Sequence, residues 1–101
     1  MVTNKQQVKS LLTANAAKLK NFGVMRVGIF GSFASGKNQP ASDVDLLVNF
    51  DKTQKTFRNF MAAAEFTEKL MGRSVDFITA ESLSPYLRPY IEQEVEYVQI
   101  A

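Results

Sequence analysis

Three aspartates have the side chains and the spacing to do chemistry. Asp43 and Asp45 stand two residues apart in a β-prone run, so both would point to one face of a strand, roughly 6–7 Å apart. Carboxylates that close repel each other, which raises one pKa unless a cation lies between them. Asp76 stands inside a second short apolar run, where an acid is costly to bury without a partner. If the two runs lie side by side, we expect the three carboxylates to form one cluster.

The residue types that are missing narrow the chemistry further. The sequence contains no cysteine and no histidine. This excludes disulfides, thiolate nucleophiles, zinc sites built on Cys or His, and triads with an imidazole base. Catalysis would therefore use carboxylates, lysine, hydroxyls, backbone amides or a hard cation with oxygen ligands, and Mg²⁺ is the ion expected for a carboxylate cluster.

A glycine–serine pair follows directly on the apolar run of residues 25–30. Gly31 would allow the backbone to approach a ligand closely, and Ser32 at a helix start would offer its hydroxyl and nearby N–H groups to a phosphate. Together with the carboxylates, this pair predicts a site for a nucleoside triphosphate and Mg²⁺. One carboxylate there could take a proton from an attacking hydroxyl.

Each of these features also has a structural interpretation. A lone Asp-x-Asp is most often a solvated turn. Asp76 alone could be an edge-strand charge that discourages strand pairing, and Gly28 is expected to serve packing. Residues 31–37 also match the start of a Walker A loop, but Asn38 replaces the required hydroxyl and Pro40 stands where a long helix should begin, so we reject that alternative. Lys37 is then interpreted as a solvated lysine.

The periodicity of apolar residues predicts the elements that position these side chains. A capping box with Thr3 as N-cap and Gln6 opens a helix that ends at Gly23, and Thr56 is the expected N-cap of a second helix that ends at Gly72. The apolar face of the first helix is expected to contain Val8, Leu11, Leu12, Ala16, Leu19 and Phe22, and that of the second Phe57, Phe60, Met61, Ala64 and Met71.

Four strands are expected over residues 25–30, 43–50, 74–79 and 95–100, and the stretch between Phe33 and Ser42 is expected to be a loop after at most a short helical turn. Pro85 and Pro89 are expected to bracket a short helix whose length Pro89 limits. The predicted fold is a single α/β (α+β) domain over residues 1–101, with a small mixed sheet, helices packed on one face and the carboxylates at the sheet edge.

Composition excludes several other classes of protein. The chain has 101 residues, 46% of them hydrophobic, and a net charge of +2. No dense basic run is present, so binding of nucleic acid is not indicated. No apolar run approaches the roughly 20 residues that a membrane span requires, and the cytoplasm is the expected location.

Two segments resemble a known family. Gly31-Ser32-Phe33-Ala34-Ser35-Gly36, followed by Ser42-Asp43-Val44-Asp45-Leu46-Leu47-Val48, is similar to the signature of the DNA-polymerase-β-type nucleotidyltransferases. The short length, the run around Asp76 and the tail over residues 83–100 resemble the minimal nucleotidyltransferases (MNT) of prokaryotes. These are commonly the antitoxin halves of HEPN–MNT toxin–antitoxin pairs.

The resemblance implies a role for each matched residue. Asp43 and Asp45 match the two metal-binding aspartates, and Asp76 matches the third carboxylate, which helps to bind the catalytic metal and activates the acceptor hydroxyl. Gly31 and Ser32 match the pair that holds the triphosphate. Members of the family move AMP from ATP to a hydroxyl with Mg²⁺, two ions being expected, and in the antitoxins that hydroxyl is a tyrosine of the partner HEPN toxin. All five positions fit the pattern.

Two functions from different classes follow from these residues. The first is a Mg²⁺-dependent nucleotidyltransferase that adenylylates a protein hydroxyl. A chain of 101 residues leaves little room for an acceptor-binding domain, so the acceptor is expected on a separate protein. The alternative is an antitoxin that neutralises its partner by binding alone. Transfer to a small molecule, as in the related aminoglycoside nucleotidyltransferases, ranks lowest because those enzymes carry extra domains.

Overall fold

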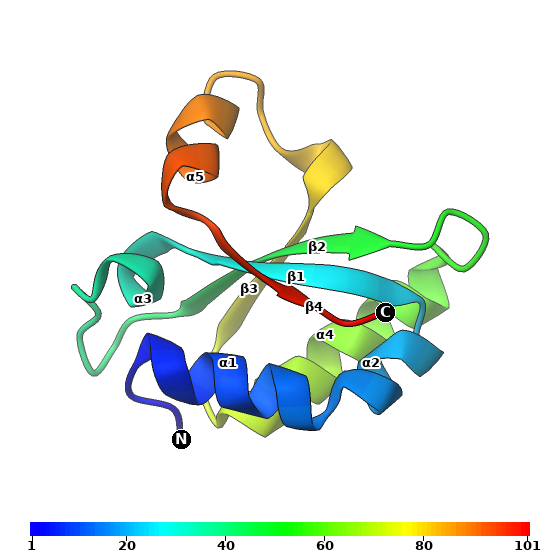
Figure 1. The fold of residues 1–101 in the computed structure, drawn as a ribbon, viewed down its shortest axis with the longest axis horizontal. Coiled ribbons are helices and arrows are strands. Elements are labelled where there is room, and N and C mark those ends of the chain that lie inside the picture. The colour runs from blue at the N-terminus through cyan, green and yellow to red at the C-terminus, as the bar shows by residue number, and fades with distance from the viewer.

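A computed structural model describes residues 1–101. The elements follow one another along the chain as α1 (Lys5–Ala14), α2 (Ala16–Asn21), β1 (Val24–Phe30), α3 (Gly31–Ser35), β2 (Val44–Phe50), α4 (Phe57–Met71), β3 (Val75–Thr79), the 3₁₀ turn η1 (Ala80–Ser82), α5 (Arg88–Glu94) and β4 (Glu96–Gln99). Figure 1 shows this arrangement.

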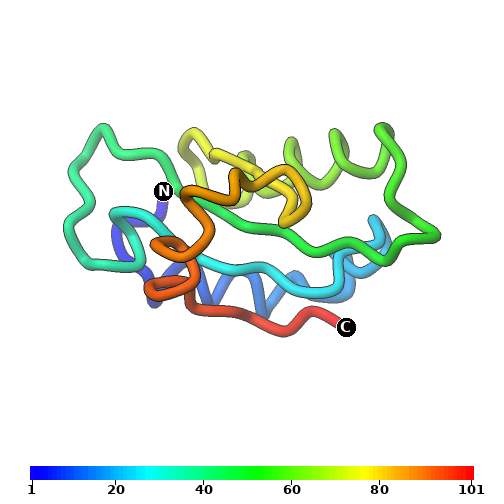
Figure 2. Tube along the Cα trace, turned by 90° about the horizontal axis from the view of Figure 1, so that it is seen from above, coloured from blue at the N-terminus to red at the C-terminus, as the bar shows by residue number.

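The four strands form one mixed sheet in the order β3-β2-β1-β4. β1 runs antiparallel to both β2 and β4, whereas β3 runs parallel to β2. Figure 2 shows the strands side by side, with β3 and β4 at the two edges. The mixed sheet predicted from the sequence is therefore confirmed. The parallel pair requires a long crossover connection, which α4 provides.

The main core lies between one face of the sheet and α1, α2 and α4, on the lower side of Figure 1. Alternate residues of β2 supply it: Val44, Leu46 and Val48 are fully buried, because alternate side chains of a strand share one face. The first helical stretch contributes Val8, Leu12 and Leu19, with Leu11, Ala16 and Phe22 packed around them.

A smaller core lies on the other face of the sheet. Phe30, Leu47 and Leu83 are buried together there, and Ile91 of α5 packs against them. α1, α2 and α4 follow the prediction of one covered face, whereas α5 and η1 depart from it and cover part of the second face, above the sheet in Figure 1. The reason is that Leu47 of β2 lies on this second face, where it is buried with Phe30 and Leu83.

The first helix differs from its prediction at both its start and its middle. The N-cap is Asn4, whose side chain accepts the Gln7 N–H at 2.9 Å, while the Gln7 side chain accepts the Thr3 N–H at 2.6 Å. The capping residues are thus shifted by one position from Thr3 and Gln6, since Asn caps at least as well as Thr. The helix breaks at Asn15, whose side-chain amide donates to the Leu11 carbonyl at 2.8 Å and competes with the backbone.

The second half of the chain contains two further corrections. Pro89 stands in the first turn of α5 and therefore starts the helix rather than limiting it, because a missing N–H costs nothing there. Thr56 and Gly72 cap α4 as predicted. However, Phe57 is 80% exposed and Met61 is 39% exposed, so neither belongs to the buried face of α4. That face contains Ala63, Thr67 and Met71.

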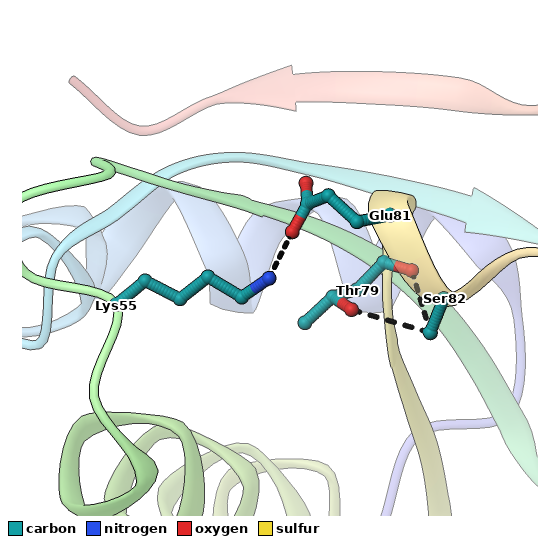
Figure 3. Close-up of polar contacts among 4 residues, drawn as sticks. All are labelled: Lys55, Thr79, Glu81 and Ser82. Atoms are coloured by element: carbon teal, nitrogen blue, oxygen red, sulfur yellow. Dashed lines mark hydrogen bonds and ion pairs between the residues drawn. The ribbon is translucent and has the colours of Figure 1, made fainter.

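Polar contacts fix the turn at the far end of β3. Lys55, in the loop before α4, forms an ion pair with Glu81 of η1, and the Ser82 hydroxyl donates to the Thr79 carbonyl at 2.9 Å (Figure 3). These contacts hold η1 where β3 leaves the sheet, at the opposite end of β3 from Asp76.

No helix in the structure has the length and apolar character needed to cross a membrane.

Candidate active site

Strand register places Asp45 beside Asp76. The two residues are direct partners in the parallel pairing of β2 with β3, and neighbouring strands lie about 4.8 Å apart. Asp43 precedes β2 by one residue, so it adjoins the same end of the pair. The structure thus brings the predicted aspartates to one region at the β3 edge of the sheet. No three carboxylates converge into a ready-made group of metal ligands.

Burial and mutual repulsion perturb Asp45. Desolvation, followed by the charges of Asp76, Asp43 and Glu94, raises the pKa of Asp45 to about 6. Asp45 is half-buried, while Asp43 and Asp76 are exposed. At neutral pH the side chain therefore carries its charge against the repulsion of three other carboxylates. A hard cation among these oxygen donors would relieve the repulsion, so the donor chemistry fits Mg²⁺.

Gly31 fits against Asp45 in a way that no other residue type would. β1 pairs with β2 so that Phe30 lies opposite Asp45, and Gly31 follows at once with a φ of +71°. A Cβ at this position would lie 2.0 Å from Oδ2 of Asp45. The glycine is thus required both by the left-handed backbone and by the carboxylate that lies over it. Ser32, the next residue, is half-buried in α3.

Arg73 supports the loop that leads to Asp43, a role that sequence reasoning missed. Its guanidinium donates from Nη1 to the Ser42 carbonyl at 2.9 Å and lies 5.2 Å from the ring centroid of Phe33. Phe33 is fully buried and anchors α3. Arg73 thereby ties α3 and the turn before Asp43 to the start of β3. Nothing in the local sequence marks it, because its partners are about thirty residues away along the chain.

Glu94 is a fourth carboxylate at the site and was also missed. Its Oε1 accepts a hydrogen bond from the Gly31 N–H at 2.9 Å, although the residues stand 63 positions apart. Glu94 is the last residue of α5, and no motif in the neighbouring sequence marks it.

The structural interpretations offered for Lys37, Gly28 and Asp76 can now be compared with the structure. Lys37 is exposed, and a Cβ on Gly28 would meet Val95 and Tyr97, as expected for a packing glycine. Asp76 lies on an edge strand but faces Asp45.

Two of the carboxylates, Asp43 and Asp76, are exposed, and Asp45 is half-buried. None of the cavities in the structure is lined by Asp43, Asp45 or Asp76. One cavity of about 520 Å³ lies behind α3, between that helix and the N-terminal residues 3–6. The Asp43 and Asp76 side chains are therefore accessible from solvent.

A sequence profile of the nucleotidyltransferase domain family matches residues 8–98. The chain belongs to the nucleotidyltransferase domain family. A protein adenylyltransferase, MntA, of Thermococcus cleftensis is 35% identical over 94 residues, which cover 92% of this chain and 94% of the relative. A Methanocaldococcus jannaschii protein assigned as a protein adenylyltransferase is 34% identical over 95 residues, which cover 91% of this chain and 95% of the relative.

Solved structures agree with this membership. A protein assigned as a minimal nucleotidyltransferase superposes with a TM-score of 0.79 at 29% identity, covering 93% of this chain and 95% of the other. A chain from a toxin–antitoxin complex with AMP-PNP superposes with a TM-score of 0.65 at 20% identity, covering 98% of this chain and 73% of the other, and shows a shared fold. The resemblance to the minimal nucleotidyltransferases is confirmed, and the protein is an enzyme of this class.

Proposed function

We propose that this nucleotidyltransferase transfers AMP from ATP to a tyrosine hydroxyl of a HEPN-type toxin and acts as its antitoxin. The observation that carries the proposal is the pairing of Asp45 with Asp76, together with the position of the Asp45 carboxylate against Gly31. It is supported by the relative named protein adenylyltransferase MntA. A further neighbour in fold, with a TM-score of 0.60 at 18% identity, comes from a tri-AMPylated Shewanella oneidensis HEPN toxin in complex with MNT antitoxin.

Each residue has a part in the proposed reaction. Asp43 and Asp45 would hold Mg²⁺, two ions being expected, with Asp76 as the third carboxylate, and Mg²⁺ supplies neutralisation of the phosphate charge when bound. Gly31 and Ser32 would hold the triphosphate with backbone N–H groups and the serine hydroxyl. The fixed contact between Gly31 and Asp45 sets the position of the phosphates relative to the carboxylates.

The transfer itself is a displacement at the α-phosphorus. The acceptor oxygen forms a bond to the α-phosphorus. The bond between the α-phosphorus and the oxygen that bridges the α- and β-phosphates breaks, and pyrophosphate leaves. Asp76 takes the proton of the attacking hydroxyl. Asp76 is exposed, so an acceptor on another protein can reach it. The exposure of Asp43 and Asp76 leaves the carboxylates accessible to an acceptor carried by a macromolecule.

Neutralisation by binding alone is the second candidate, and one observation favours it. The structure holds no ready-made group of three metal ligands, and neutralisation by binding needs none, since no transfer takes place. The Asp43→Asn, Asp45→Asn double variant separates the two candidates in cells that express the toxin partner. We expect wild type to restore growth and the double variant, at the same protein level, to fail. Full restoration by the double variant would instead establish that binding suffices.

A further inference from the structure

Glu94 occupies the Gly31 N–H, a hydrogen-bond donor that the proposed function assigns to the triphosphate. Its carboxylate accepts the N–H of Gly31 at 2.9 Å. This inference rests on the proposed function, in which the Gly31 backbone binds the triphosphate of ATP. A backbone N–H has a single hydrogen to donate, so a phosphate oxygen would compete with the Glu94 carboxylate for it. In the nucleotide-free protein, Glu94 is thus an intramolecular anion placed where a phosphate oxygen would bind.

The surroundings of Glu94 let its side chain leave without disturbing the fold. The residue is exposed and forms none of the ion pairs of the protein. The backbone of α5 stays fixed, because Ile91 and Val95 pack against the smaller core. Only side-chain rotation is needed to release Gly31.

The charge of Glu94 also acts on the site as a whole. Its carboxylate contributes to the repulsion felt by Asp45, which shows that it lies within electrostatic reach of the carboxylates. A triphosphate bound to Gly31 would meet the same repulsion. Both effects oppose nucleotide binding: the competition for the N–H and the like charge beside the phosphates.

We propose that Glu94 competes with the triphosphate for the Gly31 N–H and thereby weakens nucleotide binding. ATP must displace the hydrogen bond between Glu94 and the Gly31 N–H before it can bind there. The site therefore binds ATP more weakly than an otherwise identical site without the carboxylate. The same competition speeds the departure of pyrophosphate, whose phosphate oxygens would otherwise stay on Gly31. Glu94 thus sets nucleotide affinity through Gly31 without taking part in the transfer.

The test is direct binding of an ATP analogue with a methylene bridge between the α- and β-phosphates, in the presence of Mg²⁺, by calorimetry. The variants are Glu94→Gln and, as a matched control, Glu92→Gln, which removes the same charge from an exposed position of α5. The amide keeps the shape of Glu94 but accepts a weaker hydrogen bond, so we expect Glu94→Gln to bind the analogue about tenfold more tightly than Glu92→Gln. In the wild type, the Gly31 amide resonance should shift on addition of the analogue.

Two results would overturn the inference by itself. One is an affinity of Glu94→Gln equal to or weaker than that of Glu92→Gln. The other is a Gly31 amide resonance that does not respond while the analogue binds. If none of the proteins bound the analogue, the inference and the proposed function would both fail. The binding readout therefore keeps the two failures apart, because it needs no acceptor and no transfer.

Discussion

Gly31→Ala is expected to lower AMP transfer at least about a hundredfold while the protein remains folded. The new Cβ would lie 2.0 Å from Oδ2 of Asp45, so the carboxylate must move, and the backbone φ of +71° is strained for alanine. Displacement of a catalytic group by about 1 Å can cost a hundredfold in rate. The measurement is the single-turnover rate of label transfer, with circular dichroism as the check on folding.

Gly36→Ala is the matched control for this prediction. Gly36 also has a left-handed φ, +77°, but no atom lies within 4 Å of a Cβ built there. The two variants share the backbone strain, about 1–2 kcal/mol, and differ only in the contact with Asp45. Gly36→Ala should therefore keep most of the activity. Equal rates for the two variants would show that the fit of Gly31 against Asp45 is irrelevant to the reaction.

Asp45→Asn is expected to abolish transfer and, in the absence of metal, to stabilise the protein. The folded-state pKa of Asp45, about 6, lies above the value of an unfolded chain. A raised carboxyl pKa means that the stability contributed by the protonated form is lost as pH rises through about 6. Wild type should thus lose stability between about pH 4 and pH 6, whereas the variant should not.

The size and the sign of this effect can both be measured. For a half-exposed carboxyl, solvent screening leaves about 1 kcal/mol of the difference in unfolding free energy. Urea unfolding with a chelator, from pH 4 to pH 8, should show the stability advantage of Asp45→Asn over wild type growing between about pH 4 and pH 6 and staying constant at higher pH. Mg²⁺ should stabilise wild type and not the variant.

Asp51→Asn gives the opposite sign and is the control. Hydrogen bonds from the Thr53 backbone and hydroxyl lower the pKa of Asp51, so its charge contributes stability that is lost as pH falls. Replacement of Asp51 should therefore destabilise the protein at neutral pH. If Asp45→Asn behaved like Asp51→Asn, the carboxylates would not repel one another as the structure indicates.

Local patterns in the sequence were sufficient to predict the sheet and the aspartates. In β2 the period-two alternation places Val44 and Val48 in the core and leaves Asp45 on the other face, so the strand and its chemistry come from the same pattern. The mixed sheet and the proximity of Asp76 then depended on one pairing, which proved correct. Asp76 would have faced a different neighbour had β3 paired elsewhere.

The residues that were missed or misplaced depend on contacts that no local pattern records. Arg73 and Glu94 act on Ser42 and Gly31, which are distant in sequence, so only the folded chain reveals them. Phe57 fits the helical period of α4, yet it is the first residue of that helix and its side chain is exposed. Adjacent capping residues such as Thr3 and Asn4 compete on nearly equal terms, so the exact start of a helix is weakly determined.

The measurement that tests the central claim most directly is label transfer from ATP to a partner protein. Purified protein is incubated with Mg²⁺ and a lysate of the source cells, in parallel with ATP labelled at the α- or the γ-phosphate. We expect one labelled protein band with the α-label and no such band with the γ-label, because AMP is transferred and pyrophosphate leaves. The band should vanish with chelator and with the Asp43→Asn, Asp45→Asn double variant. If the preparation binds Mg-ATP but labels no protein, or if the double variant labels as well as wild type, the proposed transfer reaction is contradicted.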